Sequence, residues 1–170
     1  MRGPLSSVSI VAAAALAAAL TPWASERFSG TCVAVRDGDT IEVMRAGRAV
    51  RVRLWGIDCP ERGQPFGRRA RQFTSELALG KEVTVEVVEQ DRYGRIVGRV
   101  SVAGEDVGLR LVREGLAWWY EPHAPRAGEL AAAQREARTA RRGLWSDPQP
   151  VPPADWRRRR SRGRRDLARA

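Results

Sequence analysis

Apolar and polar residues alternate in several short segments of the chain. Residues 31–36 and 40–45 flank an Asp-Gly pair, which is typical of a hairpin turn between two strands. The same period of two runs through residues 50–55, where valine and leucine alternate with arginine and tryptophan. It returns on both sides of a polar turn, in residues 83–87 and 96–102. The pattern therefore predicts five short strands, the first three of them joined by tight turns.

A helical period separates the third strand from the fourth. In residues 65–79, apolar residues recur at spacings of four, three and four from Phe66 to Leu77, which indicates one face of a helix. Two more helices are predicted over residues 107–114 and 128–142, each followed directly by a glycine. This order predicts an α+β, mainly β fold: a five-stranded OB-type barrel with a helix after strand three and two C-terminal helices.

Positive charge is concentrated at the C-terminal end of the chain. The formal net charge is +10, and residues 157–170 contain eight arginines and one aspartate, so the preceding body is nearly neutral. A proline-rich run, DPQPVPP, leads into this end. We therefore predict a domain over residues 25–147, followed by a linker and a disordered basic tail over 148–170. Such a tail attracts nucleic acid or an anionic membrane surface, or it simply keeps the chain soluble.

The first 24 residues have the composition of a targeting segment. Arg2 precedes an alanine-rich apolar run over residues 8–20, which is short for a membrane span and suits the core of a signal peptide. The segment is a cleaved signal, an uncleaved N-terminal anchor or a soluble disordered leader. The first two predict a secreted, periplasmic or cell-envelope protein. Export would permit a bridge between Cys32 and Cys59. We expect none, with Cys32 as a small core residue.

Two aspartates are expected at one rim of the barrel. Asp39 begins the second strand and Asp58 ends the third, so both side chains can reach the same edge. Two neighbouring carboxylates repel each other unless a cation lies between them. Carboxylate and carbonyl oxygens are hard ligands that suit Ca²⁺ or Mg²⁺, and the sequence does not choose between these ions.

Three more charged residues complete a set suited to phosphodiester hydrolysis. Glu61 follows closely after Asp58 and can act on a water molecule, while Arg53 and Arg95 are permanently charged forks that match phosphate oxygens. Each residue alone is more often a turn, a solvated acid or a surface cation. The single histidine, His123, lies between two prolines in an expected loop, which argues against chemistry centred on histidine.

Taken in order, these motifs resemble the staphylococcal nuclease family. The resemblance covers about residues 30–145 and rests on DGDT, RLWGIDCPE, FGRRA, DRYGR, LVREGLA and GLW. It implies an OB-fold nuclease that uses Ca²⁺ to cut DNA or RNA with little sequence specificity and leaves 3′-phosphate ends. We expect it to act as a monomer.

The resemblance also assigns roles to individual residues. It implies that Asp39 and Asp58 bind the metal, together with the backbone carbonyl of Cys59. It implies that Arg53 and Arg95 bind phosphate and that Glu61 serves as general base or orients water.

Two departures from the family concern the substrate. Tyr93 and Tyr120 are the candidates for contacting the nucleotide, although the segment after Ala117 is shorter than in the best-known members. The lysine-rich loop before their first helix is replaced by RGQPFG, so the substrate is expected to be handled differently. The competing hypothesis is an OB-fold module that binds single strands through a basic groove and cuts nothing.

Overall fold

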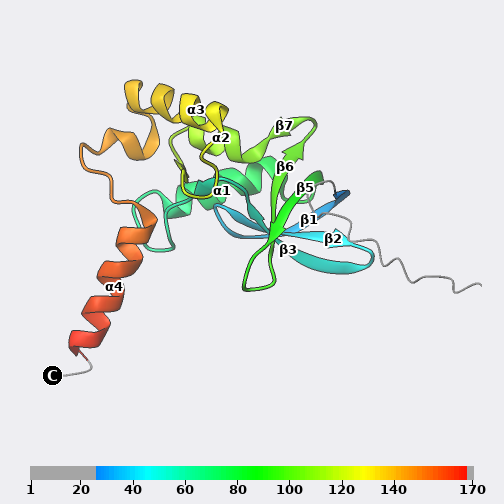
Figure 1. Ribbon diagram of the computed structural model, residues 1–170, viewed down its shortest axis with the longest axis horizontal. Helices are drawn as coiled ribbons and strands as arrows, with labels where there is room; N and C mark the ends of the chain where they lie inside the picture. Colours follow the sequence, from blue (N-terminus) through cyan, green and yellow to red (C-terminus); the bar gives the residue numbers. More distant parts are fainter. Residues whose placement is uncertain (1–25, 168–170) are drawn as a thin grey trace, which may run out of the picture.

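The computed structural model describes residues 26–167, so the leader predicted over residues 1–24 lies outside the described residues. Five strands form a closed barrel (Figure 1): β1 (Arg27–Asp37), β2 (Thr40–Arg45), β3 (Arg48–Leu54), β5 (Glu82–Gln90) and β6 (Ile96–Val102). Neighbours in the order β3-β2-β1-β5-β6 are antiparallel, and a parallel pairing of β3 with β6 closes the barrel. The predicted α+β fold with a five-stranded OB-type barrel is confirmed.

Strand β1 is longer than the alternation predicted. Its first half, Arg27 to Thr31, pairs with β5, and its second half, Cys32 to Asp37, pairs with β2. Because this strand bends from one partner to the other, it passes close to its neighbour at Gly30. A Cβ there would lie 1.9 Å from the Met44 carbonyl oxygen, so only glycine fits. The first residues of β1 pair with β5, which is distant in the sequence. The local alternation of apolar and polar residues therefore did not predict them as part of the strand.

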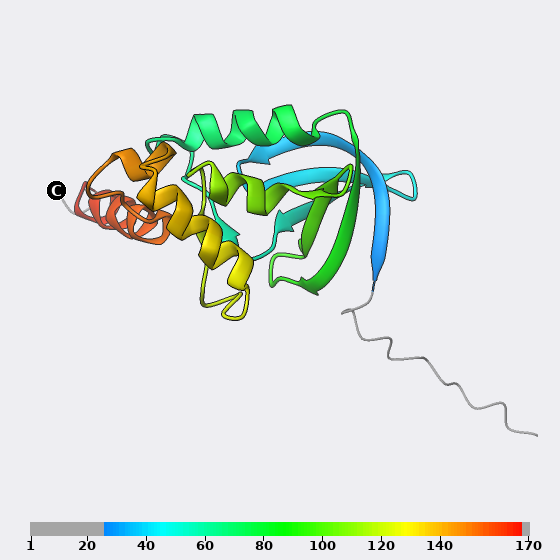
Figure 2. The ribbon, with the colours of Figure 1, turned by 90° about the horizontal axis from the view of Figure 1, so that it is seen from above.

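The helices lie on one side and at one end of the barrel (Figures 1 and 2). They are α1 (Gly67–Ala78), α2 (Val107–Arg113), α3 (Gly128–Thr139) and the 3₁₀ turn η2 (Gly143–Ser146). Three two-residue strands connect them to the barrel: β7 (Glu105–Asp106) pairs with β6, and β4 (Ile57–Asp58) pairs with β8 (Trp118–Trp119). The three predicted helices are confirmed, with ends that differ by at most three residues.

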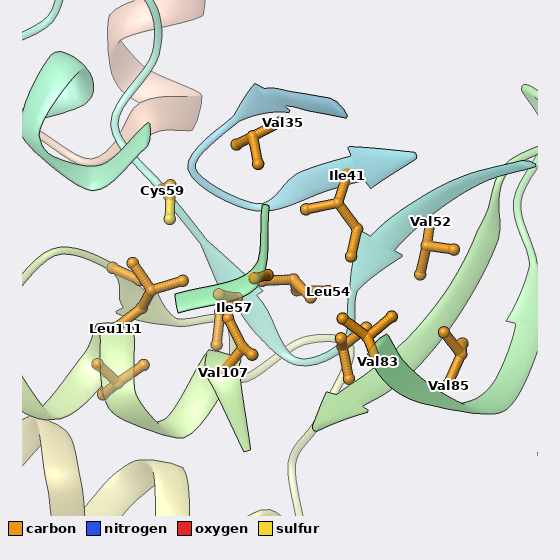
Figure 3. Close-up of a cluster of buried hydrophobic side chains, with 14 of the residues drawn as sticks. Val35, Ile41, Val52, Leu54, Ile57, Cys59, Val83, Val85, Val107 and Leu111 are labelled. Carbon is orange, nitrogen blue, oxygen red and sulfur yellow. The ribbon is translucent and has the colours of Figure 1, made fainter. Parts of the chain in front are cut away.

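A single hydrophobic core joins the barrel to α1 and α2. Ile41, Leu54 and Val83 from the barrel belong to one buried cluster with Val107 of α2 (Figure 3), and each is almost fully buried. Burying such side chains gives most of the free energy that holds the layers together, about 1.5–3 kcal/mol for each one. Both cysteines are buried and free, as expected. The Cys59 thiol belongs to this core rather than to a reactive surface.

The C-terminal segment differs from our prediction of a disordered tail. Residues Pro153–Leu167 form a further helix, α4, which extends away from the barrel (Figure 1). Proline is favourable in a first helical turn, and arginine is a strong helix former, so the run of arginines continues the helix that the prolines begin. In the described part of the chain, no helix is both long enough and apolar enough to span a membrane.

The Asp-Gly turn before β2 is fixed by helix α1. The hydroxyl of Thr74, which is fully buried, lies 2.6 Å from the carbonyl oxygen of Gly38 and donates a hydrogen bond to it. A Cβ on Gly38 would lie 2.8 Å from the Cβ of Ala70, so the turn packs directly on the helix. This contact determines the position of the next residue, Asp39, which directly precedes β2.

We predict that Thr74→Val lowers the free energy of unfolding by about 1–2 kcal/mol, because the buried Gly38 carbonyl loses its partner while the shape is kept. Urea unfolding followed by circular dichroism measures the change. The control is Ser75→Ala, which removes the neighbouring hydroxyl that bonds only to Arg71 in its own helix; its expected effect is within about 0.5 kcal/mol. Equal stability of the Thr74→Val variant and the wild type would contradict this role.

Candidate active site

Arg53 lies between Asp39 and Asp58 and forms an ion pair with each. Its Nη1 is 3.1 Å from Asp39 Oδ1, and its Nη2 is 2.9 Å from Asp58 Oδ1. Both aspartates are almost fully buried, at 5% and 3% exposed. The two carboxylates predicted to share a rim therefore meet at one guanidinium group.

Backbone contacts explain why these side chains converge. Asp39 directly precedes β2, Arg53 is the sixth residue of β3, and Asp58 ends β4. The Asp39 carbonyl accepts a hydrogen bond from Leu54 N at 2.8 Å, and the Cys59 N–H donates to Asp39 Oδ2 at 3.0 Å. The turn before β2 is thus bonded to both ends of the segment that carries Arg53 and Asp58.

Burial and charge act in opposite directions on this cluster. Burial and the neighbouring Asp39 carboxylate raise the pKa of Asp58, and Arg53 and Arg157 oppose that rise. Burial alone would lower the pKa of Arg53, but the two aspartates raise it overall. Burial, followed by the charges of the same aspartates, raises the pKa of the Cys59 thiol well above its usual value. Cys59 is therefore a neutral thiol, and only its backbone is available for the role implied by the resemblance.

Closure of the barrel brings Arg95 to the same region. The parallel pairing of Arg53 with Val97 places the start of β6 beside the end of β3, and Arg95 directly precedes β6. Its guanidinium group is 2.7 Å from Asp91 Oδ2. Burial alone would raise the pKa of Asp91, but hydrogen bonds from Arg95 and Tyr93 lower it overall. Asp91, in the same turn, therefore fixes the position of the Arg95 guanidinium group.

Glu61 is positioned through the buried side chain of Gln64. The Glu61 N–H donates to Gln64 Oε1 at 2.9 Å, and the Gln64 N–H donates to the Glu61 carbonyl oxygen at the same distance. The side-chain amide of Gln64 also donates to the Val151 carbonyl oxygen at 2.6 Å. This residue therefore ties the loop carrying Glu61 to the linker that leads to α4.

Arg157, in the first turns of α4, reaches the acids of the site. It forms an ion pair with Glu61, and its Nη2 is 3.3 Å from Asp58 Oδ2. Burial alone would lower the pKa of Arg157, but Asp58 and Glu61 raise it overall. The basic segment that we expected to be a free tail thus supplies a second counter-charge to the buried cluster.

These residues surround one cavity of about 400 Å³. All five charged residues selected from the sequence line it, together with Cys59, Arg157 and two aromatic residues, Tyr93 and Tyr120. Tyr120 stacks on His123, with ring centroids 4.9 Å apart, and both rings also line an adjoining cavity of about 510 Å³. Tyr93 is 69% exposed and lies beside the guanidinium groups of Arg92 and Arg95. The site thus combines charged groups with aromatic surfaces.

Sequence analysis missed four residues of this site: Gln64, Asp91, His123 and Arg157. Asp91 was visible as the first acid of the DRYGR turn, and its spacing of four from Arg95 indicates a local ion pair. No sequence pattern indicated a role for Gln64, because one of its two partners, Val151, is distant from it in the sequence. The sequence did not single out Arg157, because it is one of four consecutive arginines.

We predict that Arg53→Met lowers the free energy of unfolding by about 3 kcal/mol, because it leaves two buried carboxylates without their shared cation. The measurement is urea unfolding in the presence of a chelator. Arg51→Met serves as the control on the same strand, since Arg51 is exposed and lies 3.7 Å from Glu42; its expected effect is within about 0.5 kcal/mol. Equal losses in the two variants would show that Arg53 has no special structural role.

Comparison with known proteins identifies the family. Residues 51–147 match the family described as Staphylococcal nuclease homologue. A protein of Escherichia coli named "Uncharacterized endonuclease" is 48% identical over 132 residues, which cover 77% of this chain and 86% of that protein. A "Micrococcal nuclease" of Shigella flexneri is 40% identical over 169 residues, with 93% and 96% covered, and "Protein ParB" of Escherichia coli is 42% identical over 165 residues, with 91% and 92% covered. This chain belongs to the staphylococcal nuclease family.

Proposed function

We propose that this protein is a divalent-cation-dependent nuclease that cuts DNA or RNA with little sequence specificity and leaves 3′-phosphate ends. The observation that carries the proposal is the convergence of two buried aspartates, Glu61 and two arginines on one cavity of the barrel. Relatives that match most of the chain are named as nucleases and endonucleases, which supports a nucleic-acid substrate and a hydrolytic reaction.

The donor set of the cavity fits a hard divalent cation. Asp39, Asp58 and the backbone carbonyl of Cys59 would hold it, and all three offer oxygen, which suits Ca²⁺ or Mg²⁺. In residues 26–167 no group of three or more His, Cys, Asp or Glu side chains is placed to hold a metal, so water or substrate would supply the other ligands. When bound, the cation would supply positive charge that stabilises the pentavalent phosphorus centre.

The side chains of this chain would then divide the reaction between them. Glu61 would take a proton from the attacking water, or orient that water, as the water oxygen forms a bond to phosphorus. Arg53 and Arg95 would stabilise the negative charge that builds up on the phosphate oxygens. The bond from phosphorus to the 5′ oxygen breaks, and this oxygen takes a proton from solvent. The products are a 3′-phosphate and a 5′-hydroxyl.

Two tyrosines would contact the nucleotide beside the reacting phosphate. Tyr93 and Tyr120 line the cavity that contains Arg95, and Tyr120 with His123 extends this surface into the adjoining cavity. Aromatic rings stack on any base, so such contacts give affinity without sequence specificity. This arrangement supports a nuclease with little sequence preference.

Arg157 competes with the proposed cation for the same acid. It is paired with Asp58 Oδ2, so a cation that takes this oxygen must displace the guanidinium group. Its ion pair with Glu61 must also open before that carboxylate can act on water. The Arg157 side chain is 48% exposed, so solvent screens the pairs and displacement costs little. Arg157 would therefore neutralise the cluster until a cation replaces it.

The rest of α4 and the leader suggest where the enzyme acts. Arg159, Arg160 and Arg162 are exposed and make no ion pair with the described residues, so they are available to a polyanion. We propose that they attract nucleic acid or an anionic membrane surface to the enzyme. The apolar N-terminal segment, which lies outside the described residues, supports action in the periplasm, at the cell envelope or outside the cell.

We predict that Glu61→Gln lowers kcat on a fluorescent single-stranded oligonucleotide by about 10²–10⁴-fold, since the amide cannot accept the proton of water. Arg95→Ala is expected to lower kcat by about 10²–10³-fold, because one phosphate contact made in the transition state is lost. Thermal unfolding checks that both variants stay folded.

Matched controls for these variants lie outside the cavity. Glu114→Gln and Arg48→Ala change exposed residues of the same types, for which no side-chain partner occurs in residues 26–167, and both should cut at the wild-type rate. Wild-type activity in the Glu61 or the Arg95 variant would remove that residue from the mechanism.

A further prediction concerns the affinity for the cation. Arg157→Ala should bind Ca²⁺ about fivefold more tightly in isothermal titration calorimetry, since an ion pair worth about 1 kcal/mol no longer has to open. Arg160→Ala removes the same charge one turn later in α4 and should leave the affinity unchanged. Equal affinities in the wild type and both variants would mean that Arg157 does not occupy the cation site.

A further inference from the structure

A second cavity adjoins the candidate active site on the side of helix α1. It has a volume of about 870 Å³, more than twice that of the catalytic cavity at about 400 Å³. Its lining comes from the loop after β4 and the first turns of α1, and it shares Asp37 and Pro60 with the catalytic cavity. The two cavities are therefore neighbours.

The lining of this second cavity is strongly basic. Four arginines contribute to it, against the single acid Asp37: Arg62, Arg68, Arg69 and Arg71. Arg71 donates to the Val35 carbonyl oxygen at 3.1 Å. The other three are exposed, and their side chains have no hydrogen bond or ion pair with any described residue. Elsewhere many arginines pair with acids, as Arg53, Arg99 and Arg142 do, so the uncompensated charge here favours an anionic ligand.

An aromatic residue in an unusual backbone conformation lies among these arginines. Phe66 lines the cavity, is half-buried, and has a φ of 66° in the left-handed region. A bulky residue with positive φ is an outlier, and such strain is concentrated at functional sites. The backbone there is tightly constrained, because a Cβ on Gly67 would lie 2.2 Å from the Glu61 carbonyl oxygen. The aromatic surface is therefore held at a fixed place relative to Glu61.

We propose that this cavity, which we call the arginine groove (Arg62, Phe66, Arg68, Arg69 and Arg71), is a binding site for single-stranded nucleic acid. The guanidinium groups would hold backbone phosphates, and Phe66 would stack on a base. The groove would hold the part of the strand on one side of the bond to be cut. This inference extends the proposed nuclease function, whose catalytic cavity holds the adjoining nucleotide.

The test compares binding of long and short strands under conditions that prevent cutting. Fluorescence anisotropy with chelator present measures the affinity of the wild type, Arg68→Gln, Arg69→Gln and Phe66→Leu. The labelled ligands are a single-stranded 12-mer, the duplex of the same sequence and a dinucleotide. Arg48→Gln, at the exposed start of β3, removes one charge outside the groove and serves as the matched control. Thermal unfolding confirms that each variant is folded.

We expect each groove variant to lose affinity for the 12-mer and to keep its affinity for the dinucleotide. Each arginine variant should also make the dependence of log K on log salt shallower by about 0.7. Phe66→Leu should weaken 12-mer binding about fivefold or more without changing that slope. Arg48→Gln should change neither quantity.

Three results would overturn the proposal: unchanged 12-mer affinity in all three groove variants, the same loss in Arg48→Gln, or a larger loss for duplex than for single strands. Cleavage assays with Ca²⁺ or Mg²⁺ separate this inference from the proposed function. If the wild type cuts no strand with either ion while the binding pattern holds, the nuclease function fails and the groove stands. If the wild type cuts but the groove variants bind the 12-mer normally, only the groove fails.

Discussion

The double ion pair of Arg53 with Asp39 and Asp58 is the interaction on which the rest of the site depends. Two buried carboxylates facing each other are unstable unless a cation separates them, and here a single guanidinium group contacts both. The turn at Gly38, fixed by Thr74, presents the first acid, and the short strand β4 presents the second. Closure of the barrel through β3 and β6 then adds Arg95 to the same cavity. The contacts that close the barrel and fix its turns therefore also bring the residues of the site together.

Two arginines from different parts of the chain supply positive charge to the buried acidic cluster. Arg53 supplies one counter-charge from within the barrel, and Arg157 supplies a second from the C-terminal helix. The Arg53 side chain extends from a strand of the barrel and is mostly buried. The Arg157 side chain extends from an exposed helix, where solvent partly screens its charge. The proposed cation would therefore displace Arg157 more easily than Arg53. In this account, Arg53 maintains the site and Arg157 regulates access to it.

Local sequence patterns predicted those parts of the structure that depend on local interactions. The alternation over residues 40–45 and 96–102 matches the bounds of β2 and β6, and the 3.6 period identified α1. The meeting of Asp39 with Asp58 could be predicted because both acids lie at strand ends, where topology alone sets their positions. The bend of β1 at Gly30 and the contacts of Gln64 were not predictable, because they arise from pairings between distant segments. The sequence did not predict helix α4, because a proline-rich run favours a break in regular structure. Pro153 instead lies in the first turn of α4, where proline is favourable.

The most direct test of the central claim is a metal-dependence series with analysis of the product ends. Purified protein would be incubated with labelled single-stranded DNA and RNA in Ca²⁺, in Mg²⁺ and in chelator, and the new termini would be identified by mass spectrometry. The account predicts cleavage only with a divalent cation, and products that carry a 3′-phosphate and a 5′-hydroxyl. Equal cleavage in chelator, or no cleavage with either cation, would contradict it.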